Sequence, residues 1–161
     1  AMSLRENTVI TAAERKSLLK NGFIDWTAAD QYTQGIIADF DVRTPGTHTP
    51  AGSLSGGNLQ KFVVGREVLQ NPKVFVVNQP TWGVDAAAAA SIRQKLLDLA
   101  DNGAGVIVIS QDLDELLEIS DRFCAINEGR LSKIVPTATL EMDQIGLMMG
   151  GATADQEGAH A

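Results

Sequence analysis

Two short apolar runs stand out along the chain, VFVV at residues 74–77 and VIVI at residues 106–109. Continuous runs of this kind, rich in β-branched residues, are typical of strands that are buried on both faces of a parallel sheet. Between them lies an alanine-rich segment whose apolar stripe has helical spacing (Ile92, Leu96, Leu97 and Ala100). The order strand, helix, strand predicts an α/β fold.

The residues before the first strand predict a helical segment. Thr11 and Glu14 have the spacing of a capping box, so a short helix is expected there, with a stop at Asn21-Gly22. A second helix is expected over residues 27–40, and the residues at 43–53, rich in Thr, Pro and Gly, read as a loop.

A third helix is expected to begin in the octapeptide LSGGNLQK at residues 54–61, because apolar residues follow at helical spacing (Leu59, Phe62, Val63 and Leu69). Ser55 suits the N-cap, and Gly56 and Gly57 leave their backbone N–H groups uncovered at the positive end of the helix dipole. An anion such as phosphate fits such a helix start. An ordinary capped helix is the alternative, since short glycine motifs have many false positives. Gln60 and Lys61 are expected on a solvated face.

After the second strand, Asp112 is a suitable cap for a helix with Leu113, Leu116 and Leu117 facing inward. We then expect a hairpin of strands 122–126 and 130–135 turning at 127–129, and an amphipathic helix over 139–149. Cys124 is expected at a buried strand position, and residues 152–161 are expected to form a disordered tail.

Composition excludes several function classes. The formal net charge of −7, without clustered Lys and Arg, argues against nucleic-acid binding. The two histidines offer no credible metal ligand set. No apolar run approaches the roughly 18 residues that span a bilayer, and no secretory signal opens the chain. A cytosolic protein is therefore expected.

The order of octapeptide, strand, turn, helix and strand resembles the nucleotide-binding domain of ABC transporters. With LSGGNLQK and QPTWGVD as they stand, residues 3–151 are most similar to the second ATPase half of tandem importers for simple sugars or nucleosides. The resemblance implies a partial P-loop NTPase (ABC ATPase) domain that begins in mid-domain. Residues 1–70 would form the helical subdomain, residues 71–151 the C-terminal part of the RecA-like parallel-sheet core, and residues 152–161 the tail.

The resemblance also assigns roles at a shared ATP site. Ser55, Gly56, Gly57 and Asn58 would contact ATP held by the other half. Asp85 would lie in a loop that crosses the dimer interface, with a plain helix cap as the alternative. Trp82 would be an interface anchor or a core residue.

The catalytic positions depart from the family's pattern. Asn78 and Gln79 stand where the family has an aspartate and a glutamate, and Gln111 stands where it has the switch histidine. An amide can orient a water molecule but does not accept its proton. Chance polar residues at strand ends, or deliberate mutations, are the alternatives. No GxxxxGK[ST] loop occurs in the sequence, so the chain by itself is not expected to hold ATP tightly.

The function implied is that of a fragment of the energy-coupling ATP-binding subunit of an importer, inactive alone, that completes its partner's site. ATP and Mg would be cofactors of the intact protein, and no cofactor is expected in this fragment. The partners would be the N-terminal ATPase half and the transmembrane permease subunits, at the cytoplasmic face of the membrane, and a dimer of the isolated fragment is a further expectation. A purely structural half, or a soluble ABC-type ATPase outside transport, are the alternatives.

Overall fold

The computed structural model describes residues 2–151, and the tail expected at 152–161 lies outside them. The chain divides into two compact units between Gln111 and Asp112, and each is described here by itself. The subdomain boundary expected between residues 70 and 71 is a different division, inside the first unit, and it stays a prediction.

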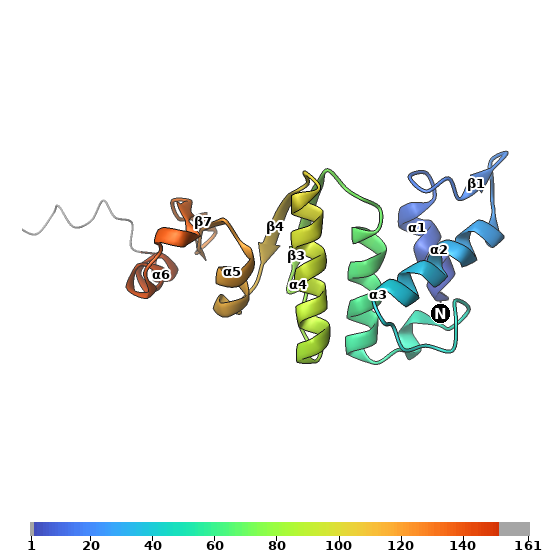
Figure 1. Ribbon diagram of the computed structural model, residues 1–161, viewed down its shortest axis with the longest axis horizontal. Helices are drawn as coiled ribbons and strands as arrows, with labels where there is room; N and C mark the ends of the chain where they lie inside the picture. Colours follow the sequence, from blue (N-terminus) through green and yellow to red (C-terminus); the bar gives the residue numbers. More distant parts are fainter. Residues whose placement is uncertain (1, 152–161) are drawn as a thin grey trace, which may run out of the picture. The chain divides into compact units, whose positions relative to one another are not determined.

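The first unit combines four α-helices with two small sheets among its described residues (Figure 1). Its elements are α1 (Leu4–Ala12), β1 (Leu19–Lys20), β2 (Phe23–Ile24), α2 (Trp26–Asp39), η1 (Ala51–Ser53), α3 (Gly56–Val68), β3 (Val74–Asn78), α4 (Ala86–Asp101) and β4 (Gly105–Ile109). This order confirms the α/β class, with helices first and a parallel strand pair after them.

The first helix begins earlier than the sequence pattern predicts. Ser3 and Glu6 form the capping box, with the Glu6 carboxylate 2.7 Å from the Ser3 backbone nitrogen, and α1 ends at Ala12. The box expected at Thr11 and Glu14 is therefore wrong. Both pairs fit the same local motif, and tertiary contacts favour the first, because the N–H of Leu4 donates to the carbonyl oxygen of Thr49 at 3.0 Å.

The pair Asn21-Gly22 turns a β-hairpin and does not end a helix. Both residues have positive φ, +53° and +81°, between the antiparallel strands β1 and β2. Positive φ at both central positions is the requirement of a type I′ hairpin turn, which Asn-Gly meets well. The second helix is confirmed as α2, where Asp25 caps the first turn by accepting from the Ala28 N–H at 3.0 Å.

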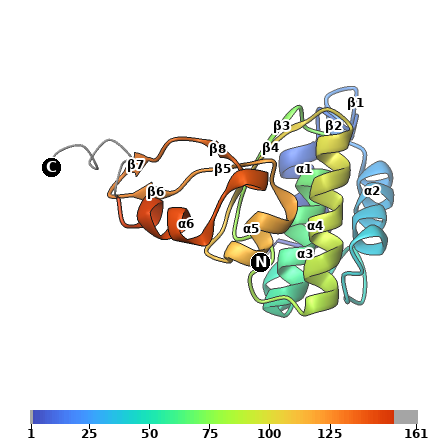
Figure 2. The ribbon, with the colours of Figure 1, turned by 60° about the vertical axis from the view of Figure 1, so that its left-hand side comes forward.

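Strands β3 and β4 pair in parallel, with Val74 opposite Gly105 and Asn78 opposite Ile109. The connection between them is α4, whose buried side chains are Ala88, Ile92, Leu96 and Leu99. Figure 2 shows α4 beside α3 in the first unit, and the two helices are in contact.

Burial on both faces of this sheet was expected and is wrong for the described residues. Phe75 is buried, but the alternate positions Val76 and Ile107 are 59% and 55% exposed. The physical reason is that the sheet has two strands, and that the helix α4 packs against β4 while one face of the pair stays exposed. Self-association of the chain stays a prediction.

The second unit contains α5 (Leu113–Ile119), β5 (Arg122–Phe123), β6 (Ile126–Asn127), β7 (Arg130–Leu131), β8 (Val135–Pro136), η2 (Thr137–Thr139) and α6 (Met142–Met149). Asp112 caps α5, and Glu128-Gly129 turns the β6–β7 hairpin, as the sequence predicts. Cys124 lies between strands and is only partly buried, so the expected buried strand position is wrong. The core of the second unit is made by Phe123, Ala125 and Ile145.

Candidate functional site

The tip of α3 carries the octapeptide, and its first turn has no side-chain cap. Ser55 occupies the N-cap position, but its hydroxyl accepts no backbone N–H of the helix. Instead, the Asn58 amide donates to Ser55 Oγ at 2.9 Å, and Asn58 Oδ1 accepts from the Arg43 backbone N–H at 2.9 Å. Asn58 therefore ties the preceding loop to the helix tip, and the first N–H groups of α3 are left for another acceptor.

The two glycines of the tip have different surroundings. A Cβ atom at Gly57 would lie 2.9 Å from the carbonyl oxygen of Gly83, whereas a Cβ at Gly56 would meet nothing within 4 Å. Gly57 is needed because the turn after β3 approaches it closely. The absence of a side chain at Gly56 instead leaves the helix tip open to solvent, as anion binding requires.

Gln60 and Lys61 do not lie on a solvated face. Gln60 Nε2 donates to the carbonyl oxygens of Gln79 and Pro80, both at 3.0 Å. Lys61 is only 8% exposed, and its Nζ donates to the carbonyl oxygen and a carboxylate oxygen of Asp41 at 3.1 and 3.3 Å. A sequence signal for the burial of Lys61 existed, because residues 61, 64, 65 and 68 have the spacing of one helix face and Val64 and Val68 are apolar. The structure buries all four residues. No local pattern marks Gln60, whose partners lie 19 and 20 residues away.

Asp85 ends the turn after β3 and caps α4. Its carboxylate accepts from the Ala88 N–H at 2.9 Å. This hydrogen bond, helped by the nearby positive charges of Lys61 and Arg43, holds the pKa of the Asp85 carboxyl below its usual value. The helix-cap reading is thus met by the geometry, and the interface role stays a prediction. Trp82, in the same turn, is 72% exposed and is not a core residue.

The positions expected to be catalytic lie where the parallel strands end. Asn78 is the last residue of β3, opposite Ile109 in β4, and the Gln79 N–H donates to the Ile109 carbonyl oxygen at 2.7 Å. Gln79 has a φ of +50°, so the chain turns sharply at this point. Gln111 follows the end of β4 by two residues and is exposed. Their catalytic roles stay predictions.

These side chains do not suit a divalent cation. Amide groups lack the charge of the carboxylates that hold Mg²⁺ in proteins. Within residues 2–151, His, Cys, Asp and Glu form no group of three or more that could hold a metal ion.

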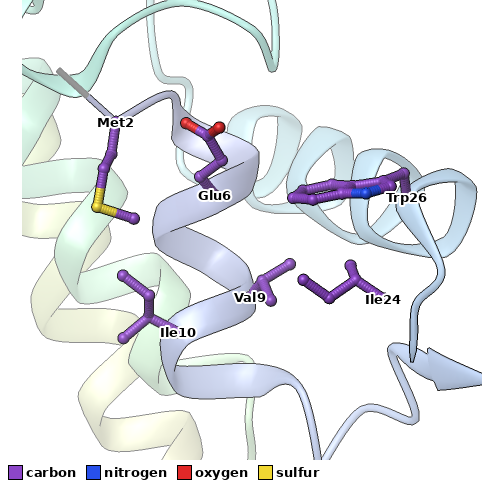
Figure 3. A pocket seen from close by; sticks show the side chains of 6 residues that line it. All are labelled: Met2, Glu6, Val9, Ile10, Ile24 and Trp26. Atoms are coloured by element: carbon purple, nitrogen blue, oxygen red, sulfur yellow. The ribbon is translucent and has the colours of Figure 1, made fainter. Parts of the chain in front are cut away.

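An apolar depression lies apart from the octapeptide, between α1 and the start of α2. Figure 3 shows Val9 and Ile24 pointing toward one another, with the Trp26 ring beside them. The Arg5 guanidinium lies 4.8 Å from the centre of that ring and also pairs with Asp30 at 3.2 Å. The depression is shallow and open to solvent.

Across residues 2–151, no helix has both the length and the apolar character to cross a membrane.

The fold is that of an ABC transporter ATP-binding cassette, of which the chain spans part. A dimeric ATP-binding cassette in a post-hydrolysis state, bound to ADP and Pi, matches with a TM-score of 0.68 at 18% identity, over 84% of this chain and 57% of that one. The ATP-binding subunit of an ABC transporter matches with a TM-score of 0.67 at 19% identity, over 96% of this chain and 60% of that one. These matches confirm the α/β class as a partial P-loop NTPase domain. No family model matches the chain.

The chain's homologues are import ATP-binding proteins of ABC transporters for nucleosides and sugars. It is 36% identical over 155 residues to the nucleoside import ATP-binding protein NupA of Lactococcus lactis subsp. cremoris (strain MG1363), covering 96% of this chain and 31% of that protein. It is 40% identical over 126 residues to the galactose/methyl galactoside import ATP-binding protein MglA of Escherichia coli (strain K12), covering 78% of this chain and 25% of that protein. The resemblance to ATP-binding proteins of sugar and nucleoside importers, drawn from the octapeptide, is confirmed, and the assignment to the second half of a tandem pair stays a prediction. The chain spans about a third or less of these relatives.

Proposed function

We propose that this chain is part of the energy-coupling ATP-binding subunit of an importer for simple sugars or nucleosides, and that its α3 tip binds the phosphates of ATP held by a partner half. The observation that carries the proposal is the open first turn of α3. Ser55 does not cap it, and the space over Gly56 is empty. Unsatisfied N–H groups at a helix N-terminus form a natural phosphate site.

The helix dipole supports an anion at this tip. The chain as a whole has a net charge of −7, yet Arg43 and Lys61 lie close enough to help lower the pKa of Asp85 beside the tip. Because the carboxylates of Asp85 and Asp41 balance these two charges, the positive end of the helix dipole is what favours a triphosphate and stabilises the charge that develops during phosphoryl transfer. A serine hydroxyl and backbone N–H groups are also suitable donors to phosphate oxygens.

The chain's own strand ends suit a site that does not hydrolyse ATP. Amides at Asn78, Gln79 and Gln111 can orient water but accept no proton, and they carry no charge for Mg²⁺. When bound to the intact protein, Mg and ATP supply the phosphoryl group and its charge neutralisation. The role of this chain is to place the backbone N–H groups of residues 55–58 against the phosphates.

The names of the relatives support the transport role. Import ATP-binding proteins for nucleosides and galactose share 35–40% of their residues with this chain over the matched regions. The partners would then be an N-terminal ATPase half of the same protein and transmembrane permease subunits, with the ATPase on the cytoplasmic side of the membrane. One solved cassette of the same fold is a dimer, which fits a site shared between two halves.

The experiment is Gly56→Val in the complete tandem protein assembled with its permease. A Cβ atom at this position meets nothing within 4 Å, and the branched side chain of valine should cover the helix tip and hinder phosphate from reaching the N–H groups. We expect ATPase activity to fall on the order of 10²-fold, as when a charge-stabilising donor is removed. Gly52→Val is the matched control, because Gly52 is also exposed with nothing within 4 Å of a Cβ. A purely structural half would give normal ATPase activity in both variants.

A further inference from the structure

The turn that connects β3 to α4 is held by few bonds of its own. Inside the turn, the Trp82 N–H donates to the Gln79 carbonyl oxygen at 3.2 Å, and the Val84 N–H donates to the Thr81 carbonyl oxygen at 3.4 Å. Both lie at or beyond the long end of ordinary N–H···O bonds. Trp82 is mostly exposed and adds little packing. The position of this turn therefore depends on contacts with other elements.

Gln60 supplies such a contact from α3. Its side-chain amide donates to two successive carbonyl oxygens of the turn, those of Gln79 and Pro80, at 3.0 Å each. One amide nitrogen has two hydrogens, so a single Gln60 side chain satisfies both carbonyls. The side chain is partly buried, which shields these bonds from competing water.

A second contact lies one helical turn earlier. A Cβ on Gly57 would come within 2.9 Å of the Gly83 carbonyl oxygen and 3.6 Å of the Val84 Cα. The backbone of the α3 tip thus abuts the far side of the same turn. On another side of α3, the Nζ of Lys61 donates to Asp41, two residues after the end of α2. The start of α3 is consequently held by the segment that follows α2 and by the turn together.

We propose that Gln60 is a positioning residue that fixes the β3–α4 turn against the tip of α3, so that the phosphate-binding N–H groups and the turn bearing Gln79, Trp82 and Asp85 are held as one unit. Gln60 touches no phosphate in this account and acts through the turn. The importance of the unit for ATP hydrolysis rests on the proposed function. The two hydrogen bonds by which Gln60 holds the turn, called the Gln60 clamp below, do not depend on that function.

The first experiment measures amide hydrogen exchange in the 161-residue chain. Gln60→Leu keeps the size of the side chain and removes both donors. We expect the amides of Trp82 and Val84 to exchange about tenfold faster or more, because two hydrogen bonds that fix the turn are lost. The amide of Ile92, in the middle of α4, should keep its protection. Gln94→Leu is the matched control, since Gln94 is a helical glutamine whose amide donates only within α4, to Asp98 at 2.8 Å.

A second variant separates hydrogen bonding from packing. Gln60→Glu keeps the shape of the side chain but cannot donate when ionised, so it should loosen the turn at least as much as Gln60→Leu. It also carries the test if Gln60→Leu does not fold. Unchanged exchange of Trp82 and Val84 in both variants would overturn the proposal. So would loosening in the leucine variant alone, because packing would then be the cause.

The last arm uses the complete tandem protein. Gln60→Leu should lower kcat for ATP hydrolysis about tenfold with little change in KM for MgATP, since a misplaced tip loses interactions made in the transition state. If Gly56→Val abolishes hydrolysis and Gln60→Leu leaves kcat unchanged, the positioning role is wrong and the proposed function stands. If the turn loosens in the chain and neither variant alters hydrolysis, the proposed function fails and the clamp stands.

Discussion

Gly65 packs its backbone directly against the ring of Phe40. A Cβ atom on Gly65 would lie 2.6 Å from Cδ2 of that ring, closer than real Cβ contacts allow. Phe40 is the C-cap residue of α2 and is only 4% exposed, so the ring has little room to move away. This approach lets α3 lie close to the end of α2, which in turn sets where the octapeptide sits.

Gly65→Ala should therefore destabilise the fold. Overpacking of a buried contact costs about 1 to 3 kcal/mol, more than the helix propensity that alanine adds. The free energy of unfolding in urea measures the effect. Gly35→Ala is the matched control: Gly35 is within α2 with nothing within 4 Å of a Cβ, so alanine should stabilise by up to about 1 kcal/mol. Equal effects at the two positions would contradict the close approach.

The two glycines of the α3 tip should respond differently to alanine. Gly57→Ala should destabilise by about 1 to 3 kcal/mol, because the new methyl group meets the backbone carbonyl of Gly83. Gly56→Ala should be near neutral or slightly stabilising, since the space there is open. Urea unfolding of both variants tests this. A larger loss at Gly56 than at Gly57 would show that the turn does not approach the helix as described.

Lys61 should contribute to stability despite its charge. Lys61→Met keeps the aliphatic length but removes the donor to the Asp41 carbonyl oxygen and carboxylate. We expect a loss of about 1 kcal/mol, a modest figure because the Asp41 side chain is 79% exposed and solvent screens the ion pair. Lys73→Met, at an exposed position just before β3, should change the free energy of unfolding by less than about 0.5 kcal/mol. Similar losses in the two variants would remove any special role for Lys61.

Stability should fall in acid partly through Asp30. The Thr47 hydroxyl, 2.7 Å from Asp30 Oδ1, holds the pKa of this carboxyl below its usual value, and Arg5 lowers it further. Because the folded pKa lies below the unfolded one, the stabilisation is present above pH about 4 and is lost as the pH falls toward the folded pKa. Asp30→Asn should reduce the slope of stability against pH in this acid range. An unchanged slope in urea unfolding at several acid pH values would contradict the assignment.

Local patterns predicted the elements whose signals lie within a few residues. Helix α2, the strands β3 and β4, and the β6–β7 hairpin follow from periodicity, β-branched runs and an Asn-Glu-Gly turn. The start of α1 did not follow, because Ser3 and Thr11 both begin a capping-box motif, and backbone bonds to the distant loop at residues 47–49 favour Ser3.

In the candidate site, too, the features set by neighbouring residues could be predicted from the sequence, and those set by distant residues could not. The octapeptide, with its open helix start, was evident from Ser55, Gly56 and Gly57. The contacts that position it were not evident. Gln60 donates a hydrogen bond to a turn 19 residues onward, and a side chain is excluded at Gly57 by the close approach of the Gly83 carbonyl oxygen. Such pairings depend on the tertiary packing of α3 against α4 and the turn, which no short window contains.

The central claim is that the tip of α3 serves ATP held by another half. The most direct measurement is a structure of the complete tandem protein trapped with MgATP, in which the distance from the backbone nitrogen of Gly56 to the nearest γ-phosphate oxygen is read. We predict a hydrogen-bond distance of about 3 Å, with the phosphate held on its other side by the partner half. Residues 55–58 facing solvent or protein, with no triphosphate near them, would contradict the account.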